Sequence, residues 1–188
     1  MPLTRQASAM QASDVTNKST TDNARDPLGL TPLPIDSRQR YLRFILSQKR
    51  EVLIPLFNIL EVMQLAFEDI LPVPNMPSCV LGVCGWQSEA LWLVDLNSMV
   101  GDRPLLQQPT NAVALTIIVV QTQEKSLGLV VEGVSDINLF DPAHIRMEKG
   151  LCPPSLEPYV LGYCPDRADI VLDVSKIIHS PLLQSHSS

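Results

Sequence analysis

Short apolar runs separated by turn residues follow one another from residue 41 almost to the end of the chain. Runs of this length, rich in Val, Ile and Leu and bounded by polar turns, are typical of β-strands joined by hairpins. They predict strands over residues 41–46, 52–56, 113–121, 127–134, 159–163 and 170–174, two more within 80–96 on either side of a turn at Gln87, and a short edge piece at 137–140. Many short strands without a βαβ rhythm favour an all-β barrel or sandwich and disfavour a Rossmann-type nucleotide site.

Other segments depart from this pattern. In residues 56–63 the apolar positions fit a short helix, whereas Pro55 and the β-branched neighbours also allow a strand. Residues 174–179 predict a terminal helix that Pro181 ends. We expect the polar segment 102–111 and the proline-rich segment 147–158 to be loops.

The chain has two compositional regions. Residues 1–36 are rich in Ser, Thr, Asn, Asp, Gln and Pro and predict a disordered tail, because they cannot bury enough apolar surface to offset the entropy of ordering. Residues 37–188 predict one domain. Within it, V-L-G occurs at 80–82 and again at 160–162, each time after an apolar hairpin, as two related subdomains would explain.

Bulk composition narrows the functional classes. The 188 residues are 45% hydrophobic, with a net charge of −6 and a pI near 5.0. This acidic balance disfavours a nucleic-acid partner, which needs clustered Lys and Arg. No apolar run approaches the roughly 20 residues that span a bilayer, and the N-terminus lacks a hydrophobic signal core. We therefore expect a cytoplasmic protein without direct membrane insertion.

Catalysis is the less favoured interpretation. Four carboxylates follow or interrupt apolar stretches and are the candidates for acid–base chemistry: Glu61, Asp95, Glu132 and Asp173. Charged residues at strand ends are more often solvated or cap a turn, and the chain has no nucleophilic elbow or glycine-rich phosphate loop. The sequence predicts a binding module that is not an enzyme and needs no cofactor.

Four cysteines, Cys79, Cys84, Cys152 and Cys164, occur without a CxxC pair or a neighbouring histidine cluster. In a reducing compartment they are most simply small apolar packing residues. A small-ligand or metal-binding β-barrel that uses these thiols is the alternative from a different functional class.

Two tryptophans flank the polar turn. Trp92 stands among leucines and valine, which favours a place in the core. Trp86 adjoins the turn, where a large aromatic side chain serves equally well as a core residue or as an anchor for a protein partner.

Taken together, these residues resemble the CheW-like family of chemotaxis coupling proteins over about residues 39–183. The hallmark stretch of that family has the form G-V-x-N-x-R-G, a short strand and a V-D-L ending. In this chain Gly82 and Val83 begin the stretch and Val94, Asp95 and Leu96 end it, in register without a gap. Pro77, L-G-L-V-V-E-G-V (127–134) and Y-V-L-G-Y (159–163) agree as well.

The chain departs from the family at the turn. The N-x-R-G turn is here Gly85, Trp86, Gln87 and Ser88, so Gln87 replaces the arginine and Ser88 replaces the closing glycine. In the family that arginine often faces a glutamate on an early helical turn, which corresponds to Glu61. Gln87 can still bond Glu61 but lacks the charge-assisted component, and Ser88 lacks the freedom of glycine at positive φ. The tryptophans are similar to variants of cyanobacterial pilus-motility or phototaxis systems.

The resemblance implies two small five-stranded barrel-like subdomains packed together, with short helices including one near the C-terminus. It implies two partners: the regulatory domain of a CheA-type histidine kinase and the cytoplasmic tip of a chemoreceptor. Kinase or receptor contacts map to Ile59, Glu61, Val62 and Gln87, with Trp86 beside them, and a hydrophobic groove between the barrels maps to Val130, Val131 and Val134. For these three valines, simple filling of a barrel is the competing interpretation. A decoy that binds kinase without receptor is the alternative within signalling.

Overall fold

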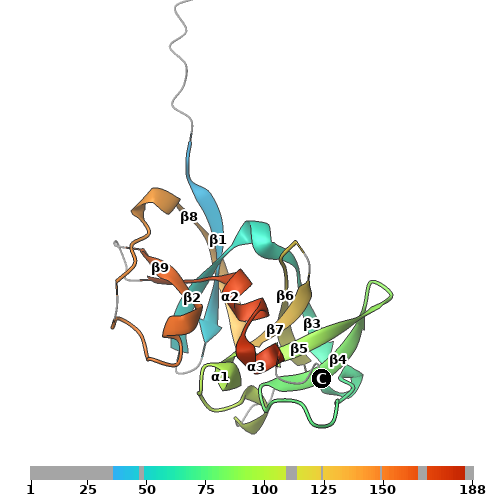
Figure 1. The fold of residues 1–188 in the computed structure, drawn as a ribbon. Coiled ribbons are helices and arrows are strands. Elements are labelled where there is room, and N and C mark those ends of the chain that lie inside the picture. Colours follow the sequence, from blue (N-terminus) through green and yellow to red (C-terminus); the bar gives the residue numbers. More distant parts are fainter. Residues whose placement is uncertain are drawn as a thin grey trace, which may run out of the picture. The chain divides into compact units, whose positions relative to one another are not determined.

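The computed structural model describes residues 36–46, 49–108, 114–123, 125–148, 150–164 and 169–184. The predicted tail, residues 1–36, lies outside these ranges except for Asp36. Figure 1 shows the strands β1 (Gln39–Leu46), β2 (Arg50–Pro55), β3 (Ile59–Ala66), β4 (Val80–Trp86), β5 (Glu89–Asp95), β6 (Ala114–Gln121), β7 (Ser126–Val131), β8 (Gly133–Phe140), β9 (Val160–Cys164) and β10 (Asp169–Leu172). The α-helices are α1 (Leu96–Met99), α2 (Val174–Ile178) and α3 (Pro181–Gln184), and single 3-10 turns include η2 (Leu56–Asn58), η4 (Leu105–Gln107) and η6 (Glu157–Tyr159).

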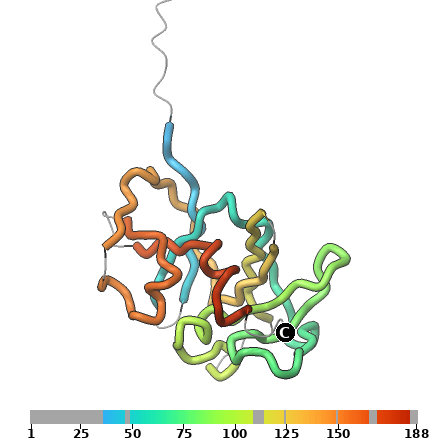
Figure 2. Tube along the Cα trace, in the orientation of Figure 1, coloured from blue at the N-terminus to red at the C-terminus, as the bar shows by residue number. Residues whose placement is uncertain are grey.

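The strands form two five-stranded sheets, one of them a half-barrel, which confirms the predicted all-β fold of two packed subdomains. The first sheet has the order β8-β1-β2-β10-β9 and the second β3-β6-β7-β5-β4. Each half of the chain therefore gives one hairpin to the sheet that the other half completes: β1–β2 joins β8, β9 and β10, while β6–β7 joins β3, β4 and β5. Figure 2 shows this exchange as the blue N-terminal strand running beside the orange and red segments.

The largest hydrophobic core lies between the two sheets. The central strands also bury their opposite faces, in smaller clusters. On β6, Ile118 and Val120 point to the core between the sheets. Ile117 and Val119 point to the other side, into a separate hydrophobic cluster that the curled second sheet encloses and that we call its interior. The first sheet has the same division, with Phe44 in the shared core and a smaller interior cluster around Tyr41. Alternation along strands such as β6 thus serves two cores at once.

Residues 56–63 form a 3-10 turn followed by strand β3, so the helical interpretation was wrong. A β-bulge between Ile59 and Glu61 shifts the pairing with β6 by one residue. The bulge breaks the alternation of apolar positions and mimics the spacing of a helix. Glu61 consequently lies on a strand and not on a helical turn.

Two further boundaries differ from prediction. The expected strand 127–134 breaks at Glu132, after which β8 runs along the edge of the first sheet and includes the predicted edge piece 137–140. At the C-terminal end α2 stops at Ile178, and Pro181 begins α3. Proline is favoured at the first position of a helix, where its missing N–H has no intrahelical partner. The expected loop 102–111 contains the single turn η4, and the expected loop 147–158 contains the first part of η6.

The two halves of the chain repeat one another, as the V-L-G echo suggested. In both halves the lead-in segment crosses over β4 or β9 through one isolated bridge, Leu71 with Val83 and Arg146 with Tyr163. The glycine before each bridge leaves room for the crossing backbone, since a Cβ on Gly82 would clash with Leu71 O and one on Gly162 with Arg146 O. The repeat therefore depends on glycine at equivalent places.

A buried ion pair joins the strands of the first sheet. The Arg43 guanidinium donates two hydrogen bonds to the Asp169 carboxylate, at 3.0 and 2.7 Å, and both side chains are 10% exposed or less. It also reaches Glu51 at 3.1 Å and Asn138 at 2.9 Å, so one side chain connects β1, β2, β8 and β10. Such bidentate, charge-assisted contacts fix the positions of strands relative to one another.

We predict that Gly82→Ala destabilises the domain by about 3 kcal/mol or more, because φ of +143° and the Leu71 carbonyl both exclude a side chain. Gly85→Ala on the same strand is the control. A Cβ there meets nothing within 4 Å, so its effect should stay within about 0.5 kcal/mol. Urea unfolding followed by tryptophan fluorescence measures both. Equal free energies of unfolding for the two variants would contradict this account of the crossing.

We also predict that Arg43→Met lowers the free energy of unfolding by about 3–5 kcal/mol, because it leaves the Asp169 carboxylate buried without its cation. Arg38→Met is the matched control, since Arg38 pairs with Asp36 at 2.8 Å with both side chains more than half exposed. Its substitution should leave stability unchanged. An Arg43→Met protein as stable as the control would show that the buried pair does not hold the sheet together.

Candidate functional site: protein-docking surfaces

The turn between β4 and β5 takes a left-handed conformation at two consecutive residues. Gln87 has φ of +48° and Ser88 has φ of +67°. Consecutive positive φ values are those of the two-residue hairpin turn for which Asn-Gly is the preferred sequence. The expectation that Ser88 occupies a position suited to glycine is therefore confirmed, and the backbone shape of the turn persists without glycine.

The partner of Glu61 is Trp86. The Trp86 Nε1–H donates a hydrogen bond of 2.9 Å to the Glu61 carboxylate, whereas Gln87 has no hydrogen bond to Glu61 among the described residues. Glu61 lies on β3 and Trp86 on β4, which are the two opposite edges of the second sheet. The bond therefore joins the edges of the curled sheet. Trp86 is half-buried against the interior cluster, so it is both an anchor of the barrel and part of its rim.

An apolar surface covers the outer side of β3. Phe57, Leu60 and Val62 are 74%, 47% and 40% exposed, and we call these three residues the β3 face. Val62 pairs with Ile118 of β6, whose side chain is buried in the core between the sheets. Ile59 is only half-exposed and packs against that core. The β3 face thus continues the apolar side of the sheet past the point where the first sheet covers it.

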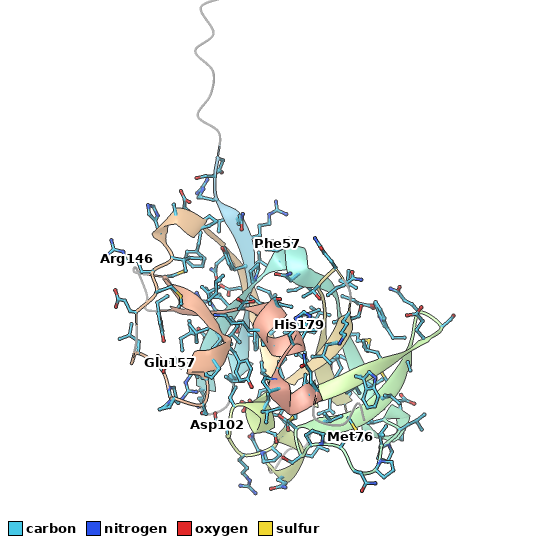
Figure 3. All side chains as sticks on the ribbon, viewed as in Figure 1. Phe57, Met76, Asp102, Arg146, Glu157 and His179 are labelled. Atoms are coloured by element: carbon cyan, nitrogen blue, oxygen red, sulfur yellow. The ribbon has the colours of Figure 1, made fainter. Side chains whose placement is uncertain are left out.

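A second apolar surface is a hollow of about 450 Å³ between the second sheet and the C-terminal helices. We call this hollow the Trp92 groove, because Trp92, which is 39% exposed, lines it. The remaining apolar lining consists of Met76, Val80, Val94, Leu127, Ile178 and Leu183. Met76, which lines the hollow, and His179, which follows the lining residue Ile178 in sequence, are labelled in Figure 3.

Placing Trp92 in the core was wrong. On β5 the neighbouring Leu91 and Leu93 fill the interior of the second sheet, so Trp92 points to the opposite face. Val94 shares that face and is covered by the first sheet, but Trp92 lies beyond the cover. Apolar neighbours in sequence do not reveal how far the covering sheet extends.

The three valines assigned to a groove have different positions. Val130 and Val131 are 0% and 2% exposed and pack in the two cores, so their side chains are not available to a partner. They fill the cores as strand alternation alone predicted. Val134, 40% exposed at the start of β8, remains on the surface. None of the three valines lines the Trp92 groove. The sequence signal for the residues that do line it was only the apolar character of β5, β7 and the terminal helix.

The candidate catalytic carboxylates have structural partners. Asp95 is fully buried and caps α1 through Ser98 N, while its second oxygen accepts a hydrogen bond of 2.7 Å from Leu105 N. Burial raises the pKa of Asp95, and these backbone N–H groups oppose that rise. Asp173 caps α2 in the same way, at the equivalent point of the other half. They terminate strands and start helices, the role expected of charges at strand ends.

The four cysteines do not form a metal site. Cys79, Cys84 and Cys164 are buried in three different hydrophobic clusters, and Cys152 packs against the core between the sheets. Within the described ranges no group of three or more His, Cys, Asp or Glu side chains has the geometry to hold a metal ion. The separation of the thiols therefore gives no support to the metal-binding alternative. In the same part of the chain, no helix has the length and hydropathy to cross a membrane.

The fold and sequence have known counterparts. A solved structure described as the scaffolding protein TtCheW from Thermoanaerobacter tengcongensis superposes with a TM-score of 0.60 at 17% identity, covering 72% of this chain and 87% of that chain. A comparison with curated proteins found no match. The family model of the CheW-like domain matches residues 40–182, well over half of the chain. This chain therefore belongs to the CheW-like domain family, whose members are non-enzymatic scaffolds and adaptors of chemotaxis-type signalling.

Proposed function

We propose that this protein couples a chemoreceptor-type sensor to a CheA-type histidine kinase, and that it does so with two separate apolar surfaces. The observation that carries the proposal is the presence of both the β3 face and the Trp92 groove on one CheW-like scaffold. Exposed apolar patches of this kind mark interaction sites on soluble domains. We expect the protein to act in the cytoplasm, in chemotaxis, phototaxis or pilus motility.

In this proposal the β3 face binds the regulatory domain of the kinase. Leu60 and Val62 stand on an edge strand, where an incoming domain gains apolar contacts without disturbing the core. Glu61 and Trp86 lie beside them, and their mutual hydrogen bond sets the positions of the rim side chains before the partner arrives. Pre-organised aromatic and aliphatic side chains of this kind are typical interface anchors.

The Trp92 groove is the proposed binding site of the receptor tip. Helical partners place their apolar side chains in hydrophobic grooves at helical spacing. The groove offers one large aromatic side chain and several aliphatic ones, with Lys125 and Gln184 at its polar rim. A tip with apolar side chains on one face and polar side chains beside them complements this lining.

We predict that Leu60→Asp with Val62→Asp lowers capture of the kinase regulatory domain by at least about tenfold, because two exposed apolar anchors that the partner would cover become charged. Capture of a receptor cytoplasmic fragment should persist. Leu106→Asp is the control, since Leu106 on η4 is 48% exposed, like Leu60, but belongs to neither surface. Biosensor binding with both partners measures the effect. Unchanged kinase capture by the double variant, or no capture of either partner by the wild-type protein, would contradict the proposal.

The turn favours a second candidate function, a decoy that occupies kinase without conveying receptor input. Gln87 and Ser88 are exposed and carry no cation, although the resemblance leads us to expect an arginine and a glycine there. A neutral turn gives up charge-assisted bonds to a partner. The decoy and the adaptor therefore differ in receptor binding and agree in kinase binding.

We predict that Gln87→Arg with Ser88→Gly leaves receptor capture within about threefold of wild type if the chain is an adaptor, since the turn already has the required backbone shape. A gain of tenfold or more from an undetectable level would instead support the decoy. Ser135→Gly, at an exposed site on β8, controls for the added flexibility. The same biosensor assay with the receptor fragment separates the two outcomes.

A further inference from the structure

The Trp92 groove carries a positive charge in a chain whose net charge is −6. Among the described residues that line it, Lys125 is the single charged side chain, and none is an aspartate or a glutamate. Charges more than about 10 Å away are largely screened at about 0.1 M ionic strength. The local cation, and not the net charge of the chain, therefore determines which groups the rim of the groove attracts.

The strand register explains why Lys125 lies on the same face as Trp92. Strands β5 and β7 are parallel, with Leu93 paired to Gly128, so Trp92 lies level with Leu127. Leu127 packs in the core between the sheets, and Lys125 precedes it by two residues just before β7. Residues two apart on an extended chain point to the same face of a sheet. A lysine at this position offers its aliphatic stem to the apolar wall and its ammonium group to the rim.

The polar donors of this wall are not used inside the fold. The Trp92 indole N–H, the Lys125 ammonium and the Ser126 hydroxyl form no hydrogen bond or ion pair with another described residue. The other tryptophan of the chain, Trp86, donates its indole N–H to Glu61. An indole N–H and an ammonium are donors only, so the group that satisfies both is an acceptor. A carboxylate accepts several hydrogen bonds at once and adds charge to those from a cation.

We propose that the Trp92 groove selects a helical partner segment that carries a glutamate or aspartate beside its apolar side chains. The apolar side chains pack on the lining of the groove, and the carboxylate accepts hydrogen bonds from Lys125 Nζ and Trp92 Nε1. Apolar contacts are non-directional, so the charge-assisted contact fixes the position of the helix along the groove. Because the receptor tip occupies this groove in the proposed function, on which the present inference rests, the carboxylate belongs to the tip.

The first test uses the full chain and two alanine-based helical peptides, with leucines at i, i+3 and i+7 and either glutamate or glutamine at i+4. Binding is followed by the NMR signals of the two indole N–H groups. Trp92 reports on the groove, and Trp86, already bonded to Glu61, is the internal control. We expect a saturable downfield shift of the Trp92 signal, with the glutamate peptide binding at least about threefold more tightly at low salt.

Lys125→Met removes the charge and keeps most of the apolar stem. The two peptides should then bind equally well, whereas Lys49→Met, at an exposed lysine outside the groove, should preserve the preference for glutamate. Equal binding of the two peptides to the wild-type chain, or a Trp92 signal that does not move, would overturn the inference. A preference for glutamate that survives in Lys125→Met would overturn it as well.

The second test separates this inference from the proposed function. Lys125→Glu should lower capture of the receptor cytoplasmic fragment at least about fivefold at low salt, and rising salt should reduce the loss. Capture of the kinase regulatory domain should persist. A wild-type chain that captures the fragment no better than Lys125→Glu would show that the carboxylate contact is wrong, while the groove remains the docking site. No capture of the fragment by the wild-type chain would overturn the receptor-docking role itself, and this inference with it.

Discussion

The burial of both faces of the central strands is the constraint on which the rest of the molecule depends. Each sheet is completed by a hairpin from the other half of the chain, so the core between the sheets cannot form until both halves are in place. Strands such as β6 and β7 have no free face. Surfaces for partners are therefore confined to the edge strands, the turns and the hollows beside the terminal helices, which is where the exposed apolar side chains of β3 and Trp92 occur.

The strands were predictable because hydrophobic runs of strand length, separated by polar turns, report burial directly. The predictions that were wrong concern features that the spacing of residues along the sequence does not encode. The bulge at Ile59 turned a strand into a helix-like pattern, and Trp92 was assigned to the core although its face is left uncovered by the first sheet. Strand alternation showed that Val130 and Val131 point to opposite sides of the sheet. It did not show that both sides are covered. The contact of Trp86 with Glu61 could not be predicted for the same reason, since only the curl of the sheet brings its two edge strands together.

The internal repeat shows which features belong to the scaffold and which to this chain's own chemistry. The capping aspartates, Asp95 and Asp173, and the crossing glycines, Gly82 and Gly162, recur in both halves and serve the fold. Other features occur in one half only. The buried ion pair of Arg43 is one of them, since Arg43 is the one buried cation among the described residues. Tyr163, at the place equivalent to Val83, is a further difference between the two halves.

The turn at Gln87 and Ser88 forms without a charged side chain at either position. The backbone of the turn is left-handed at both Gln87 and Ser88. The hydrogen-bond donor to Glu61 at the rim is the neutral Trp86 indole, and Glu61 forms no ion pair among the described residues. A partner that approaches this rim therefore meets an apolar face beside an acidic spot. Complementary charge on the partner determines orientation and association rate more than affinity. The change at the turn is thus expected to alter which partner is preferred, while the apolar face still supplies the binding free energy.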